Sequence, residues 1–148
     1  MILHTEHLGD IEYVESDVIH FPEGLPGFED EKSFIIIPSG DLEFPFSTLQ
    51  STQDEKLAFI ITDPFLFVEP YDFEMADSDT KKLGIEDEKD LEFVLAFTMV
   101  TIPENVEETT INIMAPVIIN TDKQIGKQIL LNEYDDVKFT IFKKNSEV

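Results

Sequence analysis

The sequence contains three histidines, a residue type that commonly binds metals or transfers protons. His4 and His7 have the spacing of a ligand pair, but on an extended strand positions i and i+3 point to opposite faces. We therefore interpret both as exposed strand residues. His20 lies between Ile19 and Phe21, which predicts a partly buried histidine with satisfied hydrogen bonds rather than a catalytic one.

One acid-rich stretch partly matches a calcium-binding loop. That loop needs acids at positions 1, 3 and 5, a glycine at position 6 and a glutamate at position 12. Asp77, Asp79 and Glu88 fit positions 1, 3 and 12. Lys81 and Lys82 occupy positions 5 and 6, which puts an ammonium among the ligands and removes the glycine of the sharp turn. The stretch therefore favours a capped helix.

Other arrangements that support catalysis or cofactor binding are incomplete. Gly126 and Lys127 match the end of a phosphate-binding loop, but Thr121 replaces its first glycine and Gln128 its final serine or threonine. General acid–base catalysis needs a shielded carboxyl with a raised pKa, and nothing among the 32 acids singles one out. The sequence predicts no catalytic, cofactor-binding or metal-binding residue, and no cofactor.

The charge balance excludes several partner classes. The chain has 148 residues, enough for one domain, with 32 acids, 10 lysines and no arginine, and its formal net charge is −22. Nucleic acids and anionic membranes need cationic side chains to bind, so we expect neither as a partner. Cysteine is absent, which excludes disulfides and thiol catalysis. The N-terminus lacks the pattern of a signal peptide and no apolar run exceeds five residues, so we expect a soluble, cytoplasmic protein.

The acids are unevenly distributed. The first 31 residues contain nine acids and no base. Such a segment keeps a small domain soluble, and it also attracts a basic partner and speeds its encounter.

We expect strands to position most of these residues. Isoleucine and valine are frequent, and polar turns separate short apolar runs. We predict strands at 11–15, 34–37, 44–51, 57–62, 93–102, 109–114, 117–119 and 128–131. One short helix is expected, with N-cap candidates at 77–79, a body at 80–83 and Gly84 as its stop, and a further helical turn is expected from 86–88. The fold class is mainly all-β, a small antiparallel barrel-like or sandwich domain over residues 1–137. Residues 138–148 form a C-terminal tail in which Phe139, Ile141 and Phe142 can dock.

Two loops contain more apolar residues than a solvated loop needs. Gly24 to Phe28 combines two glycines and a proline, which fix a tight loop, with Leu25 and Phe28. These two side chains either plug the core or stand out as anchors for a partner. The second loop runs from Asp63 to Tyr71 and is either an edge strand or part of a binding surface.

The chain as a whole resembles the FliW family of flagellar assembly factors. The matching stretches are Ile19 to Phe21 with Gly24 to Phe28, Pro45 to Phe46 with Leu49 to Ser51, Leu57 to Phe65 (LAFIITDPF), Asn112 to Asn120 (NIMAPVIIN) and Gly126 to Leu131 (GKQILL). The resemblance covers about residues 1–134. Each motif alone is modest, and their order and spacing together are specific.

The resemblance implies a non-enzymatic cytoplasmic regulator with a small, mostly antiparallel, barrel-like fold. Proteins that look like this bind flagellin, and they also bind CsrA, a homodimeric RNA-binding protein that represses flagellin translation. When flagellin is exported, the regulator is free and binds CsrA, which relieves repression. When flagellin accumulates, it occupies the regulator and repression returns. The resemblance favours allosteric inhibition of CsrA over occlusion of its RNA site.

Contact residues are predicted from apolar side chains beside the acid-only stretch 63–79. The predicted contacts are Leu25, Phe28, Phe65, Phe67 and Tyr71 as apolar anchors, with Glu69, Asp72 and Glu74 as flanking charges. Two other function classes stay open at this point: an acidic mimic of nucleic acid that blocks a basic protein directly, and a carboxylate enzyme that uses a divalent metal.

Overall fold

The computed structural model describes residues 1–6, 8–38, 46–68, 71, 73–131, 134 and 138–142. Its strands are β1 (Ile2–Thr5), β2 (Gly9–Glu12), β3 (Ile19–His20), β4 (Ser33–Pro38), β5 (Phe46–Ser51), β6 (Ala58–Thr62), β7 (Val94–Thr101), β8 (Thr110–Ile111), β9 (Val117–Asn120), β10 (Ile125–Gln128) and β11 (Phe139–Thr140). Its helices are α1 (Asp77–Lys82) and the 3-10 turns η1 (Glu15–Asp17), η2 (Pro64–Leu66), η3 (Glu88–Phe93) and η4 (Val106–Glu108).

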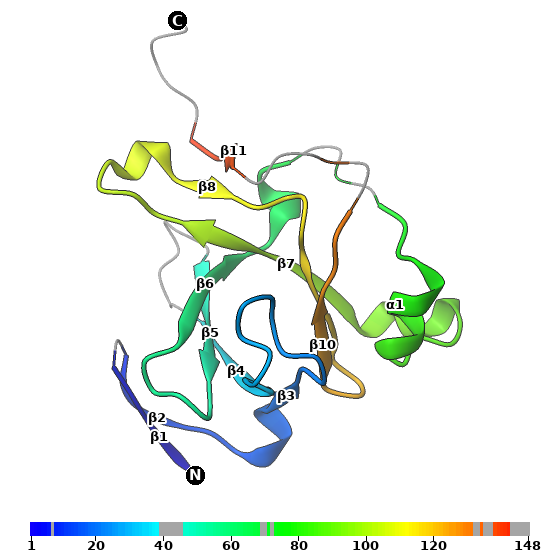
Figure 1. Cartoon of the computed structure of the whole chain (residues 1–148), viewed down its shortest axis with the longest axis horizontal. Coiled ribbons are helices and arrows are strands. Elements are labelled where there is room, and N and C mark those ends of the chain that lie inside the picture. The colour runs from blue at the N-terminus through cyan, green and yellow to red at the C-terminus, as the bar shows by residue number, and fades with distance from the viewer. Residues whose placement is uncertain are drawn as a thin grey trace, which may run out of the picture.

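The main sheet closes on itself. Strands β3, β4, β5, β6, β7, β9 and β10 form a ring, because β7 pairs with both β6 and β9 (Figure 1). The ring is antiparallel except at one place, where β3 and β10 run parallel and meet at Ile125 and His20. Strands β8 and β11 extend the sheet from β7, and β1 with β2 forms a separate hairpin. The predicted mainly β, barrel-like domain with little helix is confirmed.

Three apolar clusters hold the ring. The inside of the barrel is filled by alternate residues of its strands, as the pleat requires. These are Ile19, Phe34, Leu49, Ile61, Val117 and Ile119, and Phe21 and Leu25 from the segment after β3 join them. A second cluster, called here the outer core, covers the outside of β7 and β9 with residues from the segments after β6 and β10, including Val68, Tyr71, Leu83, Ile129 and Leu131. The β1–β2 hairpin covers β4 from outside through a third cluster around Leu3 and Ile35.

The helix forms close to its predicted position, with a different start. Gly84 has a φ of +72° just after the helix, so the predicted stop is confirmed. The N-cap is Ala76, which has no side-chain capping bond, instead of the predicted residues 77–79. Asp77 and Asp79 lie in the first turn, where carboxylates interact favourably with the helix dipole. The helical turn expected from 86–88 is confirmed as η3, which Asp87 caps through the amide of Lys89.

Strand bounds differ most in the C-terminal third. The predicted strand 109–114 shortens to β8, because the Asn112 side chain accepts hydrogen bonds from the amides of Met114 and Ala115 and turns the chain. In place of the predicted strand 128–131 the structure has β10 at Ile125–Gln128, so the two share only Gln128. In the stretch predicted as a tail, Phe139 pairs in β11 with β8 and packs on the outer core. The division of the chain at residue 137 stays a prediction, and residues 143–148 lie outside the described residues.

Candidate functional site: a groove along strand β10

Strand β10 is fully paired on one side and nearly unpaired on the other. Strand β9 pairs with all four of its residues, from Ile125 to Gln128. Strand β3 meets it only at Ile125, because β3 stops at His20 and the chain turns away. Pro22 has no amide hydrogen for a ladder, and the Gly24 amide donates to the carbonyl of Phe21 to close the turn at 2.8 Å. One edge of β10 is therefore left without a neighbouring strand after its first residue.

The open edge continues past the end of β10. The Ile129 amide donates to Pro116 at 3.0 Å and the Leu131 amide donates to Met114 at 2.8 Å, so residues 129–131 extend the pairing. Backbone groups of alternate residues point to opposite edges of an antiparallel strand, so those of Leu130 point to the open side. Within the described part of the chain, no hydrogen bond reaches the Leu130 amide or carbonyl. Its side chain is 65% exposed, whereas Ile129 and Leu131 are buried.

Four adjoining hollows follow this edge and together form what we call the β10 groove. Each shares lining residues with the next: Glu23 and Lys127, then Pro26 and Gln128, then Ile129 and Leu130. The loop after β3 forms one wall, and residues 74–82, which include α1, form another. The two hollows that meet at Leu130 measure about 360 and 240 Å³.

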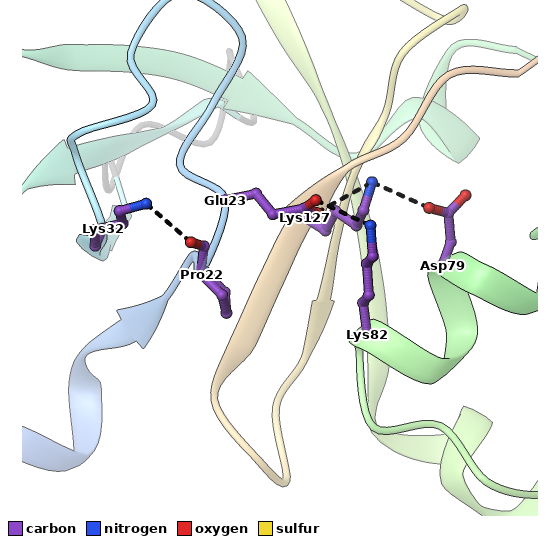
Figure 2. A network of polar contacts seen from close by, with 6 residues as sticks. All are labelled: Pro22, Glu23, Lys32, Asp79, Lys82 and Lys127. Atoms are coloured by element: carbon purple, nitrogen blue, oxygen red, sulfur yellow. Dashed lines mark hydrogen bonds and ion pairs between the residues drawn. The ribbon is translucent and has the colours of Figure 1, made fainter.

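Ion pairs join the walls of the groove to its floor. The ammonium of Lys127 on β10 lies 3.0 Å from a carboxylate oxygen of Asp79 on α1 and 3.5 Å from one of Glu23 in the loop. Lys82 on α1 reaches the other oxygen of Glu23 at 3.0 Å, as Figure 2 shows. The hydrogen bond from Lys82 lowers the pKa of the Glu23 carboxyl, and the charge of Lys127 adds to this effect. Both lysines of the groove are thus engaged by carboxylates of its own walls.

Two further contacts position the walls. Lys32 donates from its ammonium to the Pro22 carbonyl at 2.9 Å and fixes the start of the loop (Figure 2). Asn120, at the end of β9, donates from its buried amide to the Leu83 carbonyl at 2.8 Å. Because Leu83 itself is fully buried in the outer core, the C-terminal end of α1 is anchored on the barrel.

The floor needs a glycine. A Cβ built on Gly126 would lie 2.5 Å from Cζ of Phe21, inside the barrel, which is closer than real Cβ contacts. The Gly126–Lys127 pair, whose incomplete motif suggested a phosphate loop, therefore has a structural explanation. The glycine lets β10 lie against the Phe21 ring, and the lysine bridges the groove walls.

The Gly24–Phe28 loop buries Gly24 and Leu25 and exposes its other three residues. Leu25 is 1% exposed and fills the inside of the barrel, which is the core-plug alternative, and its contact with a partner stays a prediction. Phe28 is partly exposed, and its ring packs edge-on against Phe59 with centroids 5.4 Å apart. The amide of Phe28 donates to the Leu25 carbonyl at 2.7 Å, which folds the loop back on itself.

The other predicted aromatic contacts, Phe65, Phe67 and Tyr71, lie at or beside the outer core. Tyr71 is buried, and its hydroxyl donates to the Ile113 carbonyl at 2.7 Å, so it anchors the segment rather than offering a surface. Burial raises the pKa of this phenol. Phe65 is 53% exposed and contacts Tyr71 at 5.6 Å between centroids, whereas Phe67 packs on the outer core.

Glu74 is exposed and lines the groove beside Leu130. Glu69 and Asp72 lie outside the described residues. The ring of Phe28 contacts Phe59 and the ring of Phe65 contacts Tyr71 of the outer core, so these two predicted residues rest on different clusters. Sequence reasoning missed Leu130, although a run of three apolar residues in a strand cannot bury every side chain on one face.

The two described histidines, His4 and His20, are not part of a metal site. His4 pairs with Asp10 across the β1–β2 hairpin, with Nδ1 2.6 Å from the carboxylate oxygen, and both are exposed. His20 is exposed, so the predicted partial burial is wrong: its side chain points away from the barrel while Ile19 points in. His7 lies outside the described residues. In the part of the chain that was described, no three His, Asp or Glu side chains come together as a metal site, and no helix is long and apolar enough to cross a membrane.

Comparison with known proteins gives a consistent result along the chain. The family model described as "FliW protein" matches residues 2–141. A flagellar assembly factor FliW of Alkaliphilus metalliredigens is 47% identical over 132 residues, covering 89% of this chain and 80% of that protein. One from Clostridium botulinum is 40% identical over 147 residues, covering 99% and 100%. A crystal structure of the flagellar assembly factor FliW superposes with a TM-score of 0.87 at 33% identity, covering 98% of this chain and 99% of that one.

Proposed function

Because the chain belongs to the FliW family of flagellar assembly factors, we propose that it binds flagellin and antagonises the translational repressor CsrA in the cytoplasm. Flagellin and the CsrA homodimer are alternative partners in this proposal. Free protein captures CsrA and permits flagellin translation, and flagellin that accumulates displaces CsrA. The level of flagellin thereby controls its own synthesis. Membership of this family is the observation that carries the proposal.

The charge of the chain supports CsrA as a partner. An RNA-binding protein must present a basic surface, and this chain has a net charge of −22. Exposed carboxylates near the N-terminus, such as those of Glu12, Glu15 and Asp17, have no lysine within the first 31 residues to neutralise them. Attraction between surfaces of opposite charge raises the encounter rate.

Inhibition of CsrA has two possible physical forms. An acidic surface that mimics nucleic acid would occupy the RNA site of CsrA, and RNA would then compete strictly with this protein. An allosteric inhibitor binds elsewhere on CsrA, so a ternary complex exists and the coupling is reciprocal, with RNA weakening the binding of this protein by the same factor. We propose the allosteric form, and a ternary complex detected with labelled RNA supports it over mimicry.

Binding and release of two proteins need no catalytic group, so the proposed role is non-enzymatic. The alternative, a carboxylate enzyme with a divalent metal, makes a separate prediction. A metal that binds only the native state raises the melting temperature. Equal melting temperatures with chelator, Mg²⁺ and Mn²⁺ agree with the proposal, and a rise with one metal favours the enzyme.

The test is size-exclusion chromatography with light scattering on mixtures with cognate CsrA and monomeric flagellin. A complex with CsrA that dissociates when flagellin is added supports the partner switch, and its mass gives the stoichiometry. If neither partner changes the elution of the protein, the proposal is wrong.

A further inference from the structure

We infer that the open edge of β10 and residues 129–131 accepts an extended segment of flagellin as an added strand. This inference rests on the proposed function, since it assigns the flagellin contact to the β10 groove. Strand addition uses main-chain hydrogen bonds for affinity and pockets for alternate side chains for specificity. The groove offers both.

No described residue pairs with this edge at Leu130. Natural edges are shielded by a lysine, a proline, a bulge or a covering loop. Here the free amide and carbonyl belong to Leu130, and the neighbouring strand residue on the same edge is Gln128. The lysine of this strand, Lys127, is only 20% exposed and bonded to Asp79 and Glu23, so it does not guard the edge. A leucine with a 65% exposed side chain at an unpaired strand position is suited to a partner's strand.

The space around the edge fits a strand with alternating side chains. One hollow, of about 240 Å³, lies between residues 129–131 and the segment 74–79. The other, of about 360 Å³, lies beside Leu130 and is lined by Pro26, Met114 and Gln128. Successive side chains of an added strand point to opposite faces, so they would enter the two hollows in turn.

Charge selects the segment. The ammonium group of Lys82 is paired with Glu23, and that of Lys127 is paired with Asp79 and Glu23 (Figure 2). Among the described residues of the groove, the carboxylates of Glu29 and Glu74 are the ones outside this ion-pair network, and both side chains are exposed. A flagellin segment that places an apolar residue at Leu130 and a lysine or arginine toward Glu74 therefore fits best.

Of the two proposed partners, flagellin suits this groove better. An added strand pairs with an extended segment along its length. A folded homodimer such as CsrA presents a broad face, for which a groove one strand wide is a poor match. The inference assigns CsrA to another surface.

Amide hydrogen exchange on the unmodified protein tests the edge directly. In the free protein the Leu130 amide should exchange faster than those of Ile129 and Leu131, which already donate to the carbonyls of Pro116 and Met114, respectively. Saturating flagellin should slow exchange at Leu130 by at least about tenfold, because the amide gains a main-chain partner. Saturating CsrA should leave it unchanged.

Two substitutions separate the backbone from the side chain. Leu130→Pro removes only an unpaired amide, a position where an edge strand tolerates proline, and should weaken flagellin binding by about tenfold or more. Leu130→Ala keeps the amide and should weaken it less. Leu91→Ala, at another exposed leucine outside the groove, is the matched control and should change nothing.

The outcomes distinguish this inference from the proposed function. If flagellin binds and Leu130 exchanges at its free rate, strand addition at this edge is wrong and the proposed function stands. If flagellin does not bind at all, both are wrong. Since exchange is measured on the wild-type chain, poor folding of Leu130→Pro would not affect this decision.

Discussion

The Phe21 ring and the Gly126 backbone are in direct contact, so close that a Cβ on Gly126 would lie 2.5 Å from the ring. This contact connects the barrel interior to the floor of the β10 groove. Gly126→Ala should therefore destabilise the protein by about 1–3 kcal/mol, since overpacking a closed core forces the ring or the strand to move. Urea unfolding measures it.

Phe21→Leu in the same background is the control for that prediction. A smaller side chain makes room for the new methyl group, so the double variant should be more stable than the sum of the single effects predicts. Simple additivity of the two changes would show that the contact does not limit the packing.

The plug loop gives a matched pair of glycine substitutions. Gly24 has a φ of +66°, and a Cβ there would lie 2.6 Å from the Phe28 carbonyl oxygen, whereas Gly27 has a φ of +86° and no atom within 4 Å of its Cβ position. Gly27→Ala should cost about 1 kcal/mol of unfolding free energy from backbone strain alone. Gly24→Ala should cost clearly more, because the clash is with backbone and displaces the Leu25 plug. Equal unfolding free energies for the two variants would contradict this account.

The β1–β2 hairpin should respond to pH through His4. The hydrogen bond to Asp10, with the charge of that carboxylate, raises the pKa of His4 above its ordinary value of 6.5. A raised folded-state pKa means that the added stability is fully present below the unfolded pKa and is lost as the pH rises through the folded one. An NMR titration should give a pKa of His4 above 6.5, and in the Asp10→Asn variant this pKa should return toward 6.5. Identical titration curves for the two proteins would rule out the pair.

The groove walls should depend more on Lys127 than on Lys82. Lys127 is 20% exposed and bridges two carboxylates, whereas Lys82 is half exposed and bonds one. Lys127→Met should lower the free energy of unfolding by about 1 kcal/mol and Lys82→Met should lower it by less, within the range for surface ion pairs. Thermal unfolding in low and high salt measures both, and a larger loss for Lys82→Met would reverse the assignment.

Association with CsrA should weaken with ionic strength. Screening by salt reduces long-range attraction between an acidic and a basic protein, so the association rate should fall steeply and the dissociation rate should change little. Stopped-flow association at several salt concentrations gives both rates. An association rate independent of salt would mean that the charge of −22 has no part in this encounter.

Local sequence pattern predicted most of the strands and the end of the helix. Alternation of apolar and polar residues and the presence of a glycine are signals that span only a few residues. Strand β7 was predicted within one residue at each end, at 93–102 against Val94–Thr101. Three strands were missed: β1, which is four residues long, and the two-residue strands β3 and β11, which are too short to show alternation and owe their pairing to distant partners. Leu25 and Tyr71 were predicted as anchors because apolar loop residues look alike in sequence whether they face inward or outward. The open edge at Leu130 depends on where β3 stops relative to β10, which no local pattern encodes.

The parallel contact between β3 and β10 sets the order in which the protein can be made. Their strands are joined by Ile125 and His20, and the Gln124 side chain donates to the Ser16 carbonyl across 108 positions of sequence. During synthesis β3 has no partner on that side until the ribosome has released residue 125. Contacts this distant in sequence form slowly. The ring therefore stays open, and the β10 groove has no floor, until the residues of β10 are available to pair with β3 and β9.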